Sequence, residues 1–183
     1  MHRHQNLVIL ISIGFVTLLI LGNLFLIFHF SSESRHESGA RSEKVTQAVA
    51  PIITPDYHEM TPSEQNTVVR HLHHYVRKAA HFLEFASLGC LSACWVTLLR
   101  VLLGRRRRVW QTMGIPAVFC LLTAVSDEVY QTFTNRGAAA FDVLIDFSGA
   151  VCGVIFLHAA MWLIAGASAA FRRRSGRKEA SHP

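Results

Sequence analysis

Charged residues are scarce in this chain of 183 residues, making up 16% of it, against about a quarter in soluble globular domains. They are scarcest in four apolar runs, each long enough to cross a bilayer core, which takes about 20 residues of helix. Because 51% of the chain is hydrophobic, an ordinary soluble domain is excluded. We predict an all-α integral membrane protein with four transmembrane helices, at residues 7–30, 82–103, 110–133 and 142–164.

Missing sequence patterns exclude further kinds of membrane protein and of site. The apolar runs lack the strict alternation of polar and apolar residues that barrel strands need. The chain has no G-x-S-x-G, P-loop or H-E-x-x-H motif, so no familiar catalytic signature is present. Cys90 and Cys94 share one helix face, but no second pair elsewhere completes a metal site. We therefore expect neither a redox role nor a zinc site from the cysteines.

The first apolar run resembles a signal peptide only superficially. It has 24 residues, from Leu7 to Phe30, whereas the apolar core of a signal peptide has about 7 to 15. No convincing small-x-small cleavage site follows it. We expect an uncleaved helix that anchors and packs.

Lys and Arg residues predict the orientation of the chain. If the N-terminus is cytoplasmic, that side holds 11 of the 18 basic residues, including the Arg105 to Arg108 loop, and the outer side holds 11 of the 12 acids. The positive-inside rule then predicts an N-in, C-in topology. Anionic lipid headgroups are sufficient partners for this basic charge, so we do not expect nucleic-acid binding.

The chain divides into four parts. A first span, 1–30, and a polar extracytoplasmic linker, 31–60, precede a membrane domain at 61–166, and a basic cytoplasmic tail, 167–183, follows it. The linker is rich in Ser, Glu, Arg and Gln, and we expect it to be unordered because it has little apolar surface to bury. The tail is expected to anchor the chain at the cytoplasmic surface and then become disordered.

A helix start is encoded just before the second span. Thr61, Pro62 and Glu64 have the spacing of an N-cap, a first-turn proline and a capping-box partner. They predict an amphipathic helix over 62–76 that lies along the outer surface and either stops or continues into the second span. Nearby histidines at 71, 73 and 74 do not form one i, i+4 pair, so a solvated or headgroup-facing edge is favoured over a metal site.

Ionisable side chains gather at the outer ends of three spans, where their cost implies partners or a function. On the second span, Arg77, His81 and Glu84 fall on one stripe, beside Lys78. On the third span, Asp127 shares a face with Gln131, while Glu128 lies about 100° away by helical geometry. One of these two acids is expected to face inward and the other to meet water or a neighbouring helix.

The fourth span adds two more acids. Asp142 and Asp146 form a stripe with Gly149 and Gly153. Glycines spaced by four residues let a second helix approach closely, so we expect this face to pack against the second or third span. The same rotation turns both aspartates inward, towards the other polar residues.

Three helices thus deliver polar groups to one outer site. The candidate catalytic residues are His81, Glu84, Asp127 and Glu128, and the candidate substrate-binding residues are Arg77, Lys78, Gln131, Arg136, Asp142 and Asp146. Clustered carboxylates need protonation, basic partners or a divalent cation, but the sequence assigns no metal ligands and leaves any cofactor open. Alternatively, the polar network only locks the helices together.

The arrangement of these residues resembles the VanZ-like family of bacterial membrane proteins. The resemblance rests on K78-x-x-H81-F-x-E84, S126-D127-E128-x-x-Q131-x-F133-x-x-x-R136 and D142-V143-x-x-D146-x-x-G149-x-x-x-G153. In the family, Tyr is commoner where Phe85 stands and Asn is common where Asp146 stands. The resemblance implies a multi-pass protein of the bacterial plasma membrane, in a family whose named member is associated with low-level teicoplanin resistance.

Two functions fit this site. In the first, the cleft binds or modulates an anionic cell-envelope component, either a lipid-linked precursor or a phospholipid headgroup, with Arg77, Lys78 and Arg136 contacting phosphate. Such a function could affect glycopeptide susceptibility. The missing nucleophile motif favours this binding function.

The second function is a lipid phosphatase or transferase. His81 would act as general base or nucleophile, Glu84 or Asp127 would orient it or bind a divalent cation, and Arg136 would stabilise developing negative charge. A histidine with several acids is more chemistry than passive binding requires. A channel is not expected, because the charges lie only at one end of the spans.

Overall fold

The computed structural model describes residues 2–33, 35–105, 108–133 and 140–179. These residues form helices and no strand, in the order α1 (His2–Ser32), α2 (Arg35–Ile53), η1 (Tyr57–Glu59), α3 (Pro62–Leu102), α4 (Val109–Phe133) and α5 (Ala140–Glu179). The predicted all-α class is confirmed. Helices α1, α3, α4 and α5 are each long and apolar enough to cross a membrane, as predicted, so the chain is a multi-pass membrane protein.

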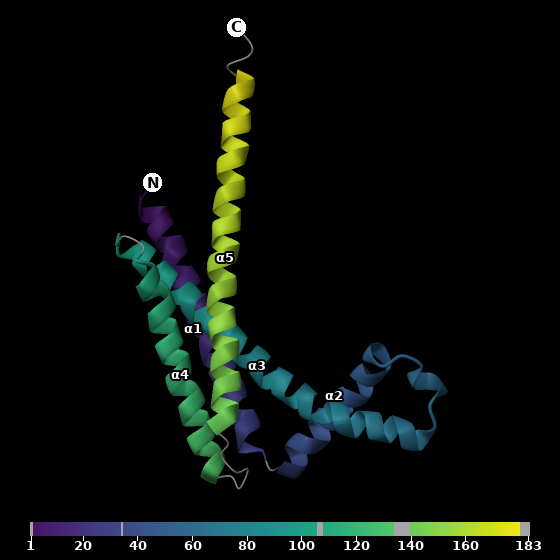
Figure 1. Ribbon diagram of the computed structural model, residues 1–183. Coiled ribbons are helices and arrows are strands. Elements are labelled where there is room, and N and C mark those ends of the chain that lie inside the picture. The colour runs from purple at the N-terminus through teal and green to yellow at the C-terminus, as the bar shows by residue number, and fades with distance from the viewer. Residues whose placement is uncertain (1, 34, 106–107, 134–139, 180–183) are drawn as a thin grey trace.

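Helix α3 is the centre of the bundle, because it packs against α1, α2, α4 and α5. Figure 1 shows the N-terminus, the start of α4 and the distal part of α5 towards one end of the molecule. The last turns of α1 and α4 and the first turns of α5 meet at the opposite end, which we call the site end. The charge distribution predicts that the site end faces the outside of the cell.

A small core ties the four spanning helices together. It consists of Ile27, Phe85, Leu88, Cys120, Ala124 and Ala150. Outside this core, large apolar side chains such as Leu18, Val118 and Phe156 are exposed. This inside-out distribution is what hydrocarbon surroundings allow, because lipid tails solvate apolar side chains as well as a protein interior does.

Helix α3 begins at the predicted capping box. The Oγ1 of Thr61 accepts a hydrogen bond from the Glu64 amide at 3.4 Å, and the Glu64 carboxylate accepts one from the Thr61 amide at 2.8 Å. The helix then runs for 41 residues without a break, about 60 Å at 1.5 Å per residue. Residues 62–76 and the second span are therefore one helix, about twice as long as a bilayer core is thick.

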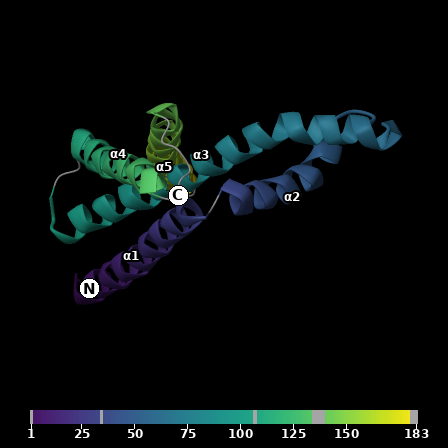
Figure 2. The same ribbon diagram turned by 90° about the horizontal axis from the view of Figure 1, so that it is seen from below.

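Residues 35–53 form α2, where the sequence predicted an unordered linker. Figure 2 shows α2 alongside the N-terminal part of α3, both extending away from the bundle. The face of α2 that is buried carries the small residues Ser38, Thr46 and Ala50. The hydroxyl of Thr46 donates to the Ser42 carbonyl one turn earlier at 2.7 Å, which satisfies it inside the contact. Small side chains buried against a partner helix leave no apolar stripe in the sequence.

At the other terminus, α5 continues as helix to Glu179. The sequence placed the end of the membrane domain at residue 166 and expected a basic anchor that becomes disordered. Residues 172 to 179 instead extend α5 by about two turns.

The contact between α3 and α5 depends on three glycines. A methyl group at Gly153 would overlap the backbone of Ala86, one at Gly149 would overlap the backbone of Phe82, and one at Gly89 would overlap the backbone of Ala150. The prediction that Gly149 and Gly153 pack against the second or third span is therefore confirmed, and the partner is the second span, α3. Gly89, on the opposing helix, makes the close approach reciprocal.

Replacing Gly153 with Ala should push α3 and α5 apart. We expect Gly153→Ala to lower the free energy of unfolding by about 1 to 3 kcal/mol, the usual cost of overpacking. Thermal unfolding of the detergent-purified protein measures this. Gly166→Ala is the matched control, because nothing lies within 4 Å of the added methyl group there. A Gly153→Ala protein as stable as the control variant would show that the close contact is not required.

Candidate functional site

His81, Asp127 and Asp146 come together at the site end from α3, α4 and α5. One donor atom from each residue lies within 4.8 Å of the others. Asp127 is 0% exposed and Asp146 is 2% exposed, while His81 is half-buried. The predicted convergence of three helices on one polar site is therefore present in the structure.

The helix ends set the depth of this trio. Asp127 precedes the last residue of α4 by six positions, and Asp146 follows the first residue of α5 by six. Each therefore lies about 9 Å along its helix from the site end. The glycine contact determines which residues of α3 and α5 lie side by side, because Gly149 meets Phe82, the neighbour of His81. Asp146 lies almost one turn before Gly149 and is thereby brought against His81.

Helix α1 also reaches the site, through Ser31. The Gln131 amide nitrogen donates to Asp127 Oδ2 at 2.9 Å and lies 3.5 Å from the hydroxyl oxygen of Ser31. Ser31 is fully buried. Sequence reasoning missed it, because it treated the first span only as a packing helix. Its only sequence signal is a hydroxyl at the outer end of an apolar run.

Among the buried carboxylate oxygens of the site, Asp127 Oδ1 and Asp146 Oδ1 receive no hydrogen bond from the described part of the chain. The Nδ1 of His81 is 3.9 Å from Asp146 Oδ1, which is too long for a hydrogen bond. An uncompensated buried carboxylate is costly, so these two atoms mark a place that protein packing alone does not satisfy.

Carboxyl groups are concentrated around Asp146. Its carboxyl group is close enough to those of Asp127, Asp142, Glu128 and Glu84 for electrostatic repulsion. Glu128 is itself only 6% exposed, so both acids of α4 face protein and neither faces bulk water. The sequence predicted that one acid faces inward and that the other meets either water or a neighbouring helix. The structure excludes bulk water for both acids.

A small recess between α3 and α5 leads into the site. It has a volume of about 10 Å³ and is lined by Arg77, Lys78, His81, Asp142, Ile145 and Asp146. Lys78 Nζ contacts Asp142 Oδ1 at 2.8 Å, so these two charges compensate each other. Arg77 is half-buried, and no acid among the described residues forms an ion pair with it.

Most of the predicted site residues therefore meet at one place. Glu84 joins through its electrostatic interaction with Asp146. Arg136 lies outside the described residues. The sequence assigned no metal ligands, whereas His81, Asp127 and Asp146 have the donor types and spacing of a candidate metal centre.

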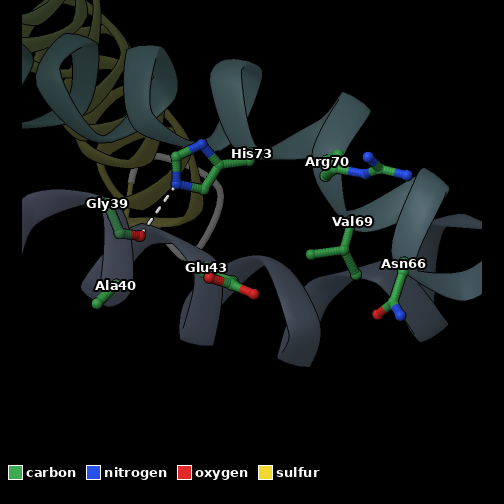
Figure 3. A pocket seen from close by; sticks show the side chains of 7 residues that line it. All are labelled: Gly39, Ala40, Glu43, Asn66, Val69, Arg70 and His73. Carbon is green, nitrogen blue, oxygen red and sulfur yellow. Dashed lines mark hydrogen bonds between the residues drawn. The ribbon is translucent and has the colours of Figure 1, made fainter. Parts of the chain in front are cut away.

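A second, larger pocket lies away from this site, between α2 and the outer part of α3. Figure 3 shows His73 pointing at α2, where a ring nitrogen is 3.0 Å from the Gly39 carbonyl oxygen. The pocket has a volume of about 740 Å³ and Glu43 is the one acid in its lining. His71 and His74 are exposed. The histidine cluster thus forms no ligand set with the buried acids.

A sequence profile of the VanZ/LLP1 family matches residues 8–164. The chain belongs to the VanZ/LLP1 family. The match includes α3 and α4 completely and most of α1 and α5, so it contains the residues of the site on all three helices that carry it. No curated protein and no solved structure matches the chain.

The VanZ/LLP1 site can perform three elementary tasks. The His81 imidazole can accept or donate a proton beside Asp146, within a polar pocket. Arg77 can hold an anion at the mouth of the recess. The trio of His81, Asp127 and Asp146 offers one nitrogen and two carboxylates, which is a donor set that transition-metal ions accept.

Neutralising the buried aspartates tests whether they serve the structure or a function. Asn has nearly the same shape as Asp but carries no charge, so Asp127→Asn and Asp146→Asn should relieve repulsion. We expect both VanZ/LLP1 variants to accumulate normally and to have an unfolding temperature at or above that of the unchanged protein. The measurement is made after a chelator has removed any metal ion from the site. Lower accumulation and a lower unfolding temperature in both would show that the carboxylates lock the helices together.

Proposed function

We propose that the site end binds an anionic lipid of the cell envelope, either a lipid-linked precursor or a phospholipid, through the phosphate of its headgroup. The observation that carries this proposal is Arg77, a half-buried cation at the mouth of the recess that no described acid neutralises. A guanidinium group matches phosphate geometry with paired hydrogen bonds. Lys78, next to it, can exchange its contact with Asp142 for a contact with the same phosphate.

The depth of the recess supports a lipid over a soluble anion. Asp127 and Asp146 lie about 9 Å along α4 and α5 from the site end, which would place them near the level where headgroups meet acyl chains if the helix ends lie at the membrane surface. Beside the recess, Phe141 is 64% exposed and Leu144 is 61% exposed on α5. These side chains provide apolar surface for acyl chains while Arg77 holds the phosphate. A protein that holds an envelope lipid in this way could alter glycopeptide susceptibility, the property associated with the named family member.

Removing the Arg77 guanidinium should weaken lipid binding selectively. A hydrogen bond to a charged group contributes about 1.5 to 3 kcal/mol, so Arg77→Ala should reduce affinity for a short-chain phosphatidic acid roughly 10- to 100-fold. Binding to the detergent-purified protein is measured by microscale thermophoresis. Diacylglycerol with the same chains tests whether phosphate is required.

Arg70→Ala is the matched control for this experiment. Arg70 is an exposed arginine on the same helix, about two turns before the recess, and its loss should leave the affinity unchanged. Equal affinity for phosphatidic acid and diacylglycerol, or equal losses in the Arg70 and Arg77 variants, would contradict the proposal.

A second candidate function is hydrolysis or transfer of the lipid's phosphoryl group. The observation favouring it is the buried trio, because an anion-binding site has no need of His81 against two buried carboxylates. In hydrolysis, His81 would take a proton from water while the water oxygen attacks phosphorus. The phosphorus–oxygen bond to the lipid would break, and the departing oxygen would take up a proton.

Phosphate release separates the two functions. If the site is hydrolytic, the purified protein should release inorganic phosphate from a lipid phosphate, and His81→Ala should reduce the rate at least about 100-fold, as expected for loss of a general base. His73→Ala is the control, since His73 lies on the same helix but contacts α2. Saturable binding without phosphate release, with and without added divalent ions, would favour the binding function.

A further inference from the structure

We infer that His81, Asp127 and Asp146 bind a divalent transition-metal ion, of the Zn²⁺ or Mn²⁺ class, at the site end. Their donor atoms lie within 4.8 Å of one another and come from three different helices. This inference does not depend on lipid binding, because it concerns the trio and not Arg77. The sequence left a divalent cation open, with Glu84 or Asp127 as a possible ligand, and the structure adds His81 and Asp146 beside Asp127.

The unsatisfied oxygens point to a ligand rather than to a merely acidic surface. Asp127 Oδ1 and Asp146 Oδ1 are buried and receive no hydrogen bond from the residues that the structure describes. Both side chains are more than nine-tenths buried. Buried charges in proteins are normally paired or coordinate metals, and His81 stands too far from Asp146 to serve as a hydrogen-bond donor.

The local charge balance favours a dication. Asp146 experiences repulsion from four other carboxyl groups. Lys78 compensates Asp142, and His81 together with Arg77 at the mouth of the recess supplies at most two positive charges against the four remaining acids. A divalent ion between Asp127 and Asp146 matches their two negative charges, with a neutral His81 as the third ligand. This pairing also removes the repulsion between the two buried carboxylates.

The donor set and the space available indicate the class of ion. Imidazole suits Zn²⁺ and other transition metals, whereas Ca²⁺ takes six to eight oxygen ligands. Donors that share an ion at about 2.1 Å each stand at most about 4.2 Å apart, so the trio needs only a small rotation of its side chains. The recess that exposes His81 and Asp146 has about 10 Å³ of space, which suits a water molecule or an ion. Three protein ligands would leave a coordination position open, as in catalytic sites.

The test is a metal titration of the full-length protein in detergent. The protein is stripped with a chelator, titrated separately with Zn²⁺ and Mn²⁺, and desalted, and bound metal is counted by mass spectrometry. We expect saturation near one ion per chain for at least one of the two metals. His81→Ala, Asp127→Asn and Asp146→Asn should each weaken that affinity at least about 10-fold.

Two control variants separate coordination from general attraction. Asp142→Asn removes a neighbouring negative charge but no ligand atom, so it should weaken binding less than each trio variant does. His158→Ala removes a half-buried histidine of α5 that instead pairs with Thr112 at 3.0 Å, and it should bind like the unchanged protein. Arg77→Ala should also retain the metal. The metal titration can therefore be interpreted even if the lipid proposal fails.

A spectroscopic measurement covers the case in which a variant fails to fold. Co²⁺ added to the stripped, unchanged protein should give the intense visible bands of a four- or five-coordinate site with a nitrogen ligand, and Zn²⁺ should abolish them. No saturable uptake of Zn²⁺ or Mn²⁺, the weak spectrum of hydrated Co²⁺, or equal loss of binding in Asp142→Asn and in the trio variants would overturn the inference.

Discussion

The close approach of α3 and α5 is the contact on which the rest of the structure depends. Gly89, Gly149 and Gly153 remove the side chains that would otherwise separate the two backbones. Interfaces of small residues are how helices associate in a bilayer, where the hydrophobic effect between helices is absent and packing has to supply the attraction. Because the contact is between backbones, it fixes rotation and depth together. Asp146 therefore meets His81 as a consequence of where the glycines stand.

This packing supports a group of side chains that oppose folding. Asp127, Glu128 and Asp146 are buried among other acids at the site end, and Gln131 donates a neutral hydrogen bond to Asp127. A core built for stability alone would place apolar residues at these positions, since replacing buried charges by well-packed apolar groups is often neutral or stabilising. Apolar contacts elsewhere, such as the core around Phe85 and Leu88, offset the free energy of burying these acids. Buried acids of this kind on both α4 and α5 support the proposal that the site holds a ligand.

The sequence predicted those features that leave a strong local or periodic signal. Four apolar runs, the capping box at Thr61 and the glycine spacing on α5 each correspond to an element in the structure. Helix α2 was missed because its buried face is made of Ser38, Thr46 and Ala50, which resemble linker composition when their partner helix is unknown. Ser31 was missed for a related reason: its contact with Gln131 joins residues 100 positions apart. Helical stripes predicted which side chains face inward, but distances between helices, and hence the metal-like spacing of the trio, follow only from the packed structure.

Anion binding and cation binding at one recess are physically compatible. A bound cation would reduce the repulsion between the carboxyl groups and a phosphate, and a phosphate could fill the open coordination position of the cation. Arg77 alone would attract a phosphate towards a group of five carboxyl groups that repel it. A divalent ion on His81, Asp127 and Asp146 would cancel two of those charges and offer an open coordination position to a phosphate oxygen. Because Arg77 and His81 are four residues apart on α3, they lie on the same helix face. One turn of that helix would therefore present both the guanidinium group and a metal ligand to a single headgroup.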